Sequence, residues 1–484
     1  MSFYSDLRRR LTALAQQNAD VFLRDTVLAP GGIPLSVAAV EGLIDQEALR
    51  LHVLTPLARR EDFDAGADTE AQLMRYGLTA GEIRQESDAE AAVSDLFHGA
   101  AVLICPAFPR ALILRLNGGA RRGPEEPVCD RTVSGPREGF VENLSVDLGL
   151  LRRRIADPGL VCEKHTLGRR SRTDVALCYL SDLALPETVE QVRAAICALD
   201  VDGIPASGWL GQLISGKRTL FPTYREIERT DIAAAQLLEG RVLLLCDGSP
   251  LAISLPALLC EHMQAAEDYY EKPAAGNLAR GLRWACFFLS VSLPALYVSL
   301  VSFRPEILPY DLLVSIASLR SRVPFSAVVE MLLMEFAVQI IVESSLRLPQ
   351  PLGQTIGVVS GIIVGQAIIS ASLASPMVLI VVAVSNICTF AIPGYSLSLT
   401  TRVLRPLMIL PAAVFGLFGF SLSWVALLLH LVGLESAGRP VMAPYAPFVP
   451  EDLQDAALRS PLSRMRLRPR SVGSRDPVRQ GKRD

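Results

Sequence analysis

The stretch that decides the fold is GQTIGVVSGIIVGQAIISAS, residues 353–372, which lies inside Leu348–Thr401, a segment without a charged side chain. An uncharged run of this length is more than twice the roughly 20 apolar residues that span the hydrocarbon core of a bilayer. We therefore predict two membrane helices, Gln354–Ala374 and Met377–Ile392, separated by a turn at Ser375–Pro376.

The first of these predicted helices has two distinct faces. Glycines recur at every fourth position and allow a second helix to approach closely, because backbone packing drives helix association in lipid. They are Gly353, Gly357, Gly361 and Gly365. At about 100° per residue, Thr355, Gln366 and Ser370 fall on the side away from the glycines. We expect the glycines to pack against a neighbouring helix and the polar face to meet water. The alternative is ordinary helix packing on both faces.

The chain from Leu282 to Leu434 has the composition of a membrane domain, whereas the residues before it mix charged and apolar side chains as a soluble protein does. Uncharged spans at Trp284–Phe303 and Pro406–Leu434 add two more predicted membrane helices. Arg280 and Arg283 precede the first span, so the positive-inside rule places its N-terminal end in the cytosol.

A fifth apolar segment, Val323–Val342, contains two carboxylates, Glu330 and Glu335. Carboxylates within a membrane are costly and usually face a polar interior, which makes these two the strongest functional candidates on physical grounds. We predict a helix that stays inside the bundle without crossing, so that four crossings keep the basic C-terminal tail in the cytosol; a fifth crossing would place it outside. The alternative role of the carboxylates is a structural ion pair with one of three arginines, Arg320, Arg322 and Arg347.

The soluble half contains a repeated pattern. The apolar spacing of Leu35–Glu47 recurs 140 residues later at Val175–Glu187, and that of Gly99–Leu114 recurs 141 residues later at Gly240–Leu255. Two nearly equal offsets indicate a duplicated α/β unit; the alternative is a chance recurrence of strand and helix patterns.

Local patterns place the elements of that half. Helices are predicted at Ser2–Gln17, Asp45–Leu57 and Val141–Ile155, and paired strands at Val21–Leu28 with Ile33–Val40 and at Ala100–Cys105 with Ala111–Leu116. The predicted fold is a soluble α/β region of two repeated units followed by an all-α transmembrane helix bundle. The predicted boundaries are residues 1–118 and 140–265 for the two units, 119–139 for their linker, 266–437 for the bundle and 438–484 for a basic, largely disordered tail.

Motifs for chemistry are missing. Nine cysteines form no CxxC pair and five histidines stand alone, which argues against a structural zinc site or a disulfide framework. Gly211–Lys217 nearly spells a phosphate-binding loop, but Arg218 stands where a serine or threonine should reach magnesium. With no GxSxG motif either, we expect no enzyme, no metal, no cofactor and no nucleic-acid partner.

Many stretches of the chain resemble the A subunit of GerA-type spore germination receptors. They are GPREGFVENL (135–144), LLRRRIADP (150–158), LEGRVLLLCDGSP (238–250), EDYYE (267–271), LPALYVSLVSFRPEILP (293–309), VPFSAVVEMLLMEF (323–336), LRLPQPLGQTIGVVSGIIVGQA (346–367), SPMVLIVVAVSNICTFAIPGY (375–395) and PYAPFVP (444–450). They occur in the family's order across residues 135–450. The SpoVAF-type spore protein, a paralogue within the family, shares these motifs and stays open as an alternative.

The resemblance implies a multi-pass protein of the spore inner membrane whose soluble region consists of two thioredoxin-like subdomains. It implies a transporter-like B subunit that binds the nutrient, a lipoprotein C subunit, and a homo-oligomeric ring that forms a nutrient-gated cation channel. In such a channel Glu330 or Glu335 would attract cations near a mouth, as acidic rings do. The alternatives are a secondary transporter, for which Pro376 and Pro393 offer helix breaks, and a non-conducting scaffold.

Overall fold

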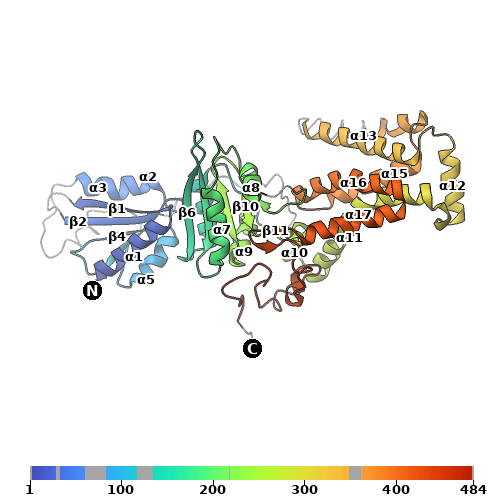
Figure 1. The fold of residues 1–484 in the computed structure, drawn as a ribbon. Helices are drawn as coiled ribbons and strands as arrows, with labels where there is room; N and C mark the ends of the chain where they lie inside the picture. Colours follow the sequence, from blue (N-terminus) through green and yellow to red (C-terminus); the bar gives the residue numbers. More distant parts are fainter. Residues whose placement is uncertain are drawn as a thin grey trace.

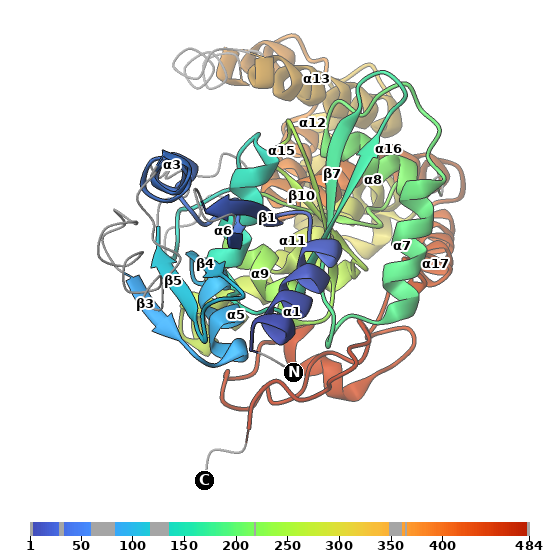
Figure 2. The same cartoon turned by 90° about the vertical axis from the view of Figure 1, so that its left-hand side faces the viewer.

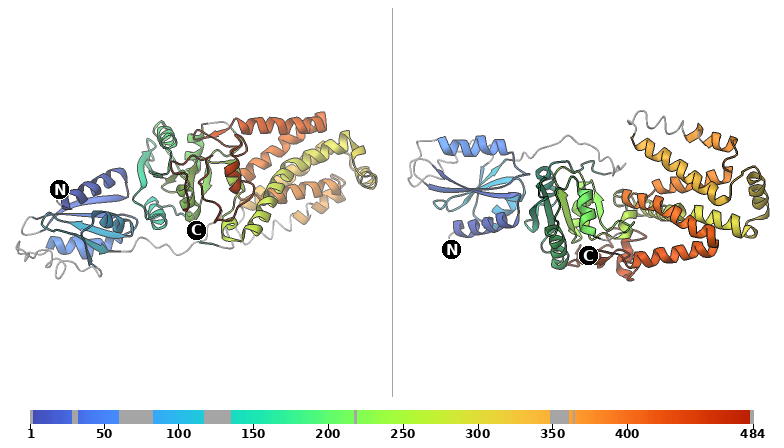
Figure 3. Two further views of the ribbon diagram at one scale, coloured as in Figure 1. Left: turned by 90° about the horizontal axis from the view of Figure 1, so that it is seen from below. Right: turned by 45° about the horizontal axis from the view of Figure 1, so that its top comes forward.

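The protein is described here from a computed structural model of residues 3–28, 33–59, 83–116, 135–216, 219–347, 361–363 and 365–481. An N-terminal α/β unit, a second α/β unit and a group of long helices lie in a row (Figure 1). The C-terminal segment returns from the helices to the second unit (Figure 3). The predicted order, an α/β region followed by a helical part, is confirmed.

The first unit is built on a five-stranded sheet with the order β1-β2-β4-β5-β3, in which every described strand pair is antiparallel. Its strands are β1 (Val21–Leu28), β2 (Ile33–Val40), β3 (Ile83–Glu86), β4 (Ala100–Ile104) and β5 (Ala111–Arg115). The interior strand β2 is apolar at every position from Val37 to Val40, because successive side chains point to opposite faces and both faces are covered.

Helices cover the two faces of this sheet (Figure 2). One face packs against α1 (Phe3–Gln17) and α5 (Ala89–Phe97), and the other against α2 (Gln46–Leu49), a π-helical turn (Arg50–Leu54) and α3 (Thr55–Arg59). The predicted helix Asp45–Leu57 is therefore interrupted in the middle. Its predicted cap is confirmed, since the Asp45 carboxylate accepts the backbone N–H groups of Glu47 and Ala48.

The second unit has a sheet of the order β6-β7-β9-β10-β8, again antiparallel at every described pair. The strands are β6 (Leu160–Leu167), β7 (Thr173–Leu180), β8 (Arg225–Ile227), β9 (Val242–Cys246) and β10 (Ala252–Leu255). One face packs against α6 (Leu144–Arg154) and α9 (Thr230–Leu238), and the other against α7 (Pro186–Cys197) and α8 (Ser207–Ser215). The strands of the two sheets thus follow the same spatial order along the chain.

Corresponding glycines end corresponding helices in the two units. Gly99 follows α5 with φ +84°, and Gly240, at the predicted offset of 141 residues, follows α9 with φ +89°. A left-handed residue after a helix favours glycine, since a side chain is strained there. The linker predicted between the units lies mostly outside the described residues.

One buried arginine joins the two units. Arg152 of α6 donates from Nε to Asp20 Oδ2 at 2.8 Å and from Nη2 to Asp20 Oδ1 at 3.1 Å, with both side chains buried. Nη1 donates to the Leu160 carbonyl at 2.6 Å, and Nη2 also reaches Asn18 Oδ1 at 3.0 Å. Because Asp20 and Asn18 belong to the first unit, this planar guanidinium fixes the relative position of the two units.

The helical part begins with a short helix that leads into a long one. Its helices are α10 (Glu267–Tyr270), α11 (Pro273–Phe303), α12 (Tyr310–Arg320), α13 (Ala327–Arg347), α15 (Pro376–Phe390), α16 (Tyr395–Phe415) and α17 (Leu417–Val432). Of the described helices, α11 and α16 are long and apolar enough to cross a membrane. With 31 residues, α11 is about 46 Å long at 1.5 Å per residue, so it extends beyond a hydrocarbon core of about 30 Å.

The predicted single span Pro406–Leu434 is wrong. Gly416 has φ +62° and ends α16, after which α17 packs back against it. A side chain at Gly416 would lie 2.9 Å from Cγ of Phe303, and one at Gly419 would lie 2.0 Å from the Pro411 carbonyl oxygen. These two glycines allow a tight helical hairpin that an uninterrupted apolar pattern does not reveal.

The predicted disorder of residues 438–484 is also contradicted, over the described part up to residue 481. This C-terminal segment contains β12 (Arg439–Pro440), which pairs with β11 (Glu435–Ser436), and a 3₁₀ turn at Pro450–Asp455. Ala443, Ala456 and Val472 are buried in a core with Leu258 and Cys260. The segment is ordered because its arginines find carboxylates and carbonyls on the second unit, as Arg479 does with Glu239.

A buried carboxyl in the second unit makes stability depend on pH. Asp147 of α6 accepts the Val141 N–H at 2.8 Å, and burial raises its pKa from 3.8 to about 8. The folded state therefore holds an extra proton, and this stabilisation is complete below the unfolded-state pKa and is lost as pH rises toward 8. Asp147→Asn keeps the acceptor oxygen without ionising. We therefore expect the melting temperature of this variant, relative to that of the native protein, to be higher at about pH 8 than at about pH 5. Asp174→Asn is the control.

Asp174 is ionised in both states over this range, because the adjacent Lys164 ammonium lowers its pKa further. Its substitution should shift the melting temperature equally at both pH values. A constant offset for Asp147→Asn as well would contradict the assignment of a protonated Asp147.

Candidate functional site

The candidate site lies where the second α/β unit meets the first long helix. Pro273 occupies the first turn of α11, where a backbone N–H would have no acceptor within the helix, so the missing N–H of proline costs no hydrogen bond. The preceding helix α10 then folds against α11, and Gly276 permits this contact because a side chain there would lie 3.0 Å from the Asp268 carbonyl oxygen. This arrangement aims the Asp268 carboxylate at the next turns of α11.

Two arginines of α11 bind that carboxylate. Arg280 Nε lies 3.2 Å and Arg283 Nη1 2.8 Å from Asp268 Oδ2, since residues three apart share one face of a helix. Arg283 Nη1 also donates to the Met263 carbonyl at 3.2 Å. Both Asp268 and Arg280 are fully buried.

The C-terminal segment supplies the second carboxylate. Arg280 Nη1 donates to Asp455 Oδ1 at 3.0 Å and to the Asp455 carbonyl at 2.8 Å. The Tyr269 hydroxyl donates to Asp455 Oδ2 at 2.8 Å, and Gln264 Nε2 donates to the Asp455 carbonyl at 2.6 Å. One arginine thus connects α10, α11 and a residue 175 positions further along the chain.

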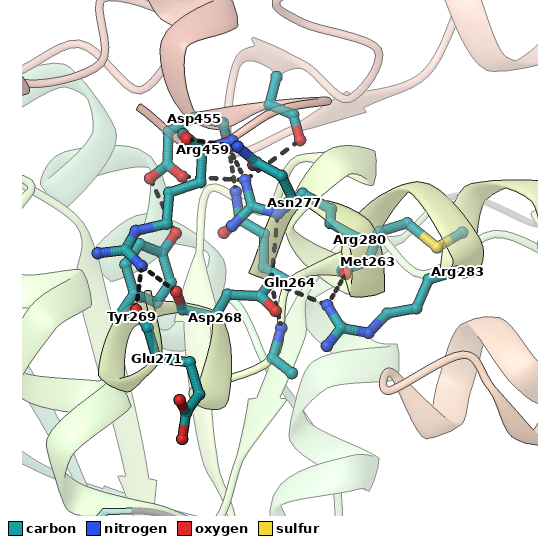
Figure 4. Close-up of polar contacts among 12 residues, drawn as sticks. Met263, Gln264, Asp268, Tyr269, Glu271, Asn277, Arg280, Arg283, Asp455 and Arg459 are labelled. Atoms are coloured by element: carbon teal, nitrogen blue, oxygen red, sulfur yellow. Dashed lines mark hydrogen bonds and ion pairs between the residues drawn. The ribbon is translucent and has the colours of Figure 1, made fainter. Parts of the chain in front are cut away.

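Arg459 completes the site (Figure 4). It donates to the carbonyls of Glu271 at 2.9 Å and of Asp268. Its own backbone exchanges two hydrogen bonds with the Asn277 amide, at 2.5 and 3.0 Å. The Tyr269 ring lies 5.4 Å from the guanidinium of Arg459 and 5.8 Å from that of Arg280. We call Asp268, Tyr269, Arg280, Asp455 and Arg459 the junction cluster.

The buried charges of the junction cluster hold α10, α11 and the C-terminal segment together. Burial raises the pKa of the Asp455 carboxyl, and the Arg280 guanidinium and the Tyr269 hydroxyl oppose that rise. A buried charge that loses its partner costs far more than the pair contributes, so the members are held together or released together. Within the described residues no three His, Cys, Asp or Glu side chains are grouped to hold a metal ion. The arrangement is suited to transmitting a movement.

A cavity of about 430 Å³ adjoins the junction cluster between α9, α10 and the C-terminal segment. Its wall includes the buried pair Arg241 and Glu261, with Nη1 and Oε2 2.9 Å apart. Residues of the second unit and of the C-terminal segment therefore line the same cavity.

The two predicted carboxylates of α13 are both buried in the helical part, and each has a cation. Glu330 Oε2 lies 3.7 Å from Arg320 Nε, and Glu330 Oε1 accepts the Ser375 backbone N–H. Glu335 Oε2 accepts from Arg405 Nη1 at 3.1 Å. Arg405 of α16 also donates to Thr389 of α15, so this pair holds three helices together. The predicted alternative, an ion pair with Arg320, Arg322 or Arg347, is present for Glu330, which pairs with Arg320. Glu335 also has an ion pair, but with Arg405, which that alternative did not name.

The glycines and polar residues of the predicted first helix are only partly described. Gly353, Thr355 and Gly357 lie outside the described residues, whereas residues 361–363 and 365–370 are helical. Gln366 and Ser370 are exposed, Gly361 has open space where a side chain would be, and Gly365 lies 3.8 Å from Leu379 by the same measure. Among the described residues, neither Gln366 nor Ser370 makes a hydrogen bond or ion pair with Glu330 or Glu335.

Sequence reasoning missed most of the junction cluster. Arg280 was interpreted only as a marker of orientation, and EDYYE, which contains Asp268 and Tyr269, only as a family motif. Asp455 and Arg459 fell in the segment expected to be disordered. Charged residues at the start of a long apolar helix were a signal that a partner should exist nearby, because a buried arginine needs one.

The fold joins two α/β units through this cluster to a group of long apolar helices, two of which are long and apolar enough to cross a membrane. The model of the family described as "Bacillus/Clostridium GerA spore germination protein" matches residues 9–471. The chain belongs to this family.

Individual relatives agree with that membership. Spore germination protein KA of Bacillus subtilis is 35% identical over 469 residues, which cover 96% of this chain and 86% of that protein. The uncharacterized membrane protein YfkQ of the same organism is 33% identical over 95% of this chain and 89% of that protein. The crystal structure of the N-terminal domain of the A subunit of the Bacillus megaterium spore germinant receptor GerK3 is 25% identical, with a TM-score of 0.40 over 52% of this chain and 93% of that domain.

Proposed function

We propose that this chain is the A-type subunit of a spore germinant receptor and assembles with copies of itself into a nutrient-gated cation channel. It crosses the spore inner membrane several times and keeps its α/β units, two copies of one thioredoxin-like unit, in the cytosol. Its partners are a transporter-like B subunit that holds the nutrient and a lipoprotein C subunit. Membership of the GerA family and two helices long enough to cross a membrane support this proposal.

The single observation that carries the gating part is the junction cluster. Arg280 fixes the start of α11 to α10 and to the C-terminal segment. A displacement of the α/β units by a partner would therefore move the first membrane helix. A nutrient can drive this only if its complex with the partner binds the open and the closed arrangement with different affinity.

The residues of the helical part take separate roles in this proposal. The ion pairs of Glu330 and Glu335 hold the helices in the closed arrangement. Gln366 and Ser370, with Thr355, form the face that meets water. The exposure of Gln366 and Ser370 in a single chain is consistent with that role. The open space beside Gly361 is where a helix of a neighbouring copy would pack.

Potassium efflux from liposomes tests the function. The purified chain is reconstituted alone and together with B-type and C-type subunits of a germinant receptor, and efflux is followed before and after nutrient is added. We expect efflux only with partners and nutrient, and Gln366→Ala should reduce it while Gln16→Ala, at an exposed glutamine of α1, should not. No efflux from protein shown to be folded and inserted would favour a non-conducting scaffold. Saturable exchange of a labelled solute would favour a secondary transporter.

A further inference from the structure

The helix α8 exposes two large apolar side chains and one uncharged polar side chain, Gln212, on the face that it turns away from its own unit. Its inner residues pack on the second sheet, and Gly211 lies so close to the Tyr224 ring that a side chain there would be 2.6 Å away. Trp209 and Leu213, one turn apart on the outer face, are 59% and 37% exposed. The helix SGWLGQLIS contains no charge. A surface helix normally carries charged side chains on this face, and α8 has none.

Three contacts place this helix and the loop after it against two of the membrane helices. Glu226, whose carboxylate would lie 3.4 Å from a side chain at Gly208, accepts a hydrogen bond from Ser396 in the first turn of α16. The Leu220 carbonyl accepts from Thr400 Oγ1 of α16 at 2.5 Å. Figure 1 shows α8 closer to these helices than α7.

The third contact fixes the position of the loop along the axis of α17. Thr219 Oγ1 lies 2.9 Å from His430 Nε2 near the C-terminal end of α17. Exposed apolar side chains continue along α17 up to this level, including Leu429 and Val432. Leu220, beside Thr219, is itself 47% exposed. The loop therefore lies level with the end of an apolar helix surface.

We propose that the outer face of α8, with Trp209 and Leu213, and the neighbouring Leu220 insert into the interfacial layer of the lipid bilayer. Indole rings prefer this layer, because the ring is apolar and its N–H reaches water or headgroups. Residues 211–215 of the near phosphate-loop motif then belong to a membrane-surface helix, which ends at Gly216 with φ +57°. This inference rests on α16 and α17 lying in the membrane, as the proposed function requires.

Tryptophan fluorescence in lipid nanodiscs tests the inference on the full chain. The protein has three tryptophans, so Trp284→Phe with Trp424→Phe leaves Trp209 alone, and Trp209→Phe with Trp284→Phe leaves Trp424 alone. The nanodiscs contain lipids brominated either near the headgroup or near the end of the acyl chain. We expect Trp209 to lose more fluorescence to the shallow bromines, and Trp424, six residues or about 9 Å before His430 on α17, to lose more to the deep ones.

A matched control carries its only tryptophan at Leu51, which is exposed in the first unit. Leu51→Trp, with all three native tryptophans replaced by phenylalanine, should respond to dissolved iodide and to neither lipid. If Trp209 behaves like this control, or is shielded from both quenchers, while Trp424 reports lipid, the inference is overturned and the membrane assignment stands. If Trp424 also fails to report lipid, the proposed membrane function itself falls.

Discussion

Replacing Arg405 with methionine is expected to lower the free energy of unfolding of the helical part by about 3–5 kcal/mol. Arg405 is fully buried among α13, α15 and α16, where it bonds to Glu335, to Thr389 and, at 3.4 Å, to the Ser385 carbonyl. Its removal leaves the Glu335 carboxylate buried without a cation. Denaturant titration in detergent micelles measures the loss.

Two further variants distinguish the loss of the Glu335–Arg405 ion pair from the loss of side-chain packing. Arg402→Met removes a partly exposed arginine of the same helix, which lies 5.6 Å from the Phe390 ring, and should cost about 1 kcal/mol or less. The double variant Glu335→Met with Arg405→Met should recover most of the stability, because no charge is then stranded. A double variant as unstable as Arg405→Met alone would show that the ion pair is not the cause.

Arg280→Met is expected to release the C-terminal segment and to uncouple the α/β units from α11. It leaves Asp268 without one of its two cations and Asp455 without its arginine, at a cost of about 3–5 kcal/mol. Hydrogen exchange should rise across residues 450–472, and nutrient-dependent potassium efflux should be lost while the first α/β unit keeps its protection.

Arg304→Met is the matched control at the opposite end of α11. Arg304 is exposed and pairs only with Glu306 at 3.2 Å among the described contacts, so its loss should change stability by less than about 1 kcal/mol. Normal efflux from Arg280→Met protein with a demonstrably released C-terminal segment would contradict the role of the junction cluster in gating.

The sequence predicted local elements well and long-range contacts poorly. The strands Val21–Leu28 and Ile33–Val40 were predicted to the residue, because alternation and a Pro-Gly-Gly turn mark their ends locally. The hairpin at Gly416 was missed, since a single glycine in an apolar run gives no sign that a helix ends there. The pairing of Glu335 with Arg405, 70 residues apart, depends on how three helices pack, which no local pattern encodes.

The C-terminal segment was misjudged for a related reason. A stretch with seven arginines between Arg459 and residue 481 has the composition of a disordered tail. Its order comes from acceptors elsewhere in the chain, such as the Leu238 carbonyl for Arg468. Composition describes a segment in isolation, whereas these arginines are ordered by a surface that forms from distant residues.

The position of Asp455 sets an order of events during synthesis. Arg280 leaves the ribosome 175 residues before Asp455. At about 5–20 residues per second, roughly 9–35 s pass before the second carboxylate exists. The helices between the two residues are made in that interval, so among the described contacts Arg280 first has Asp268 as its one carboxylate partner. The contact between the start of α11 and the C-terminal segment is therefore completed only when translation is nearly finished.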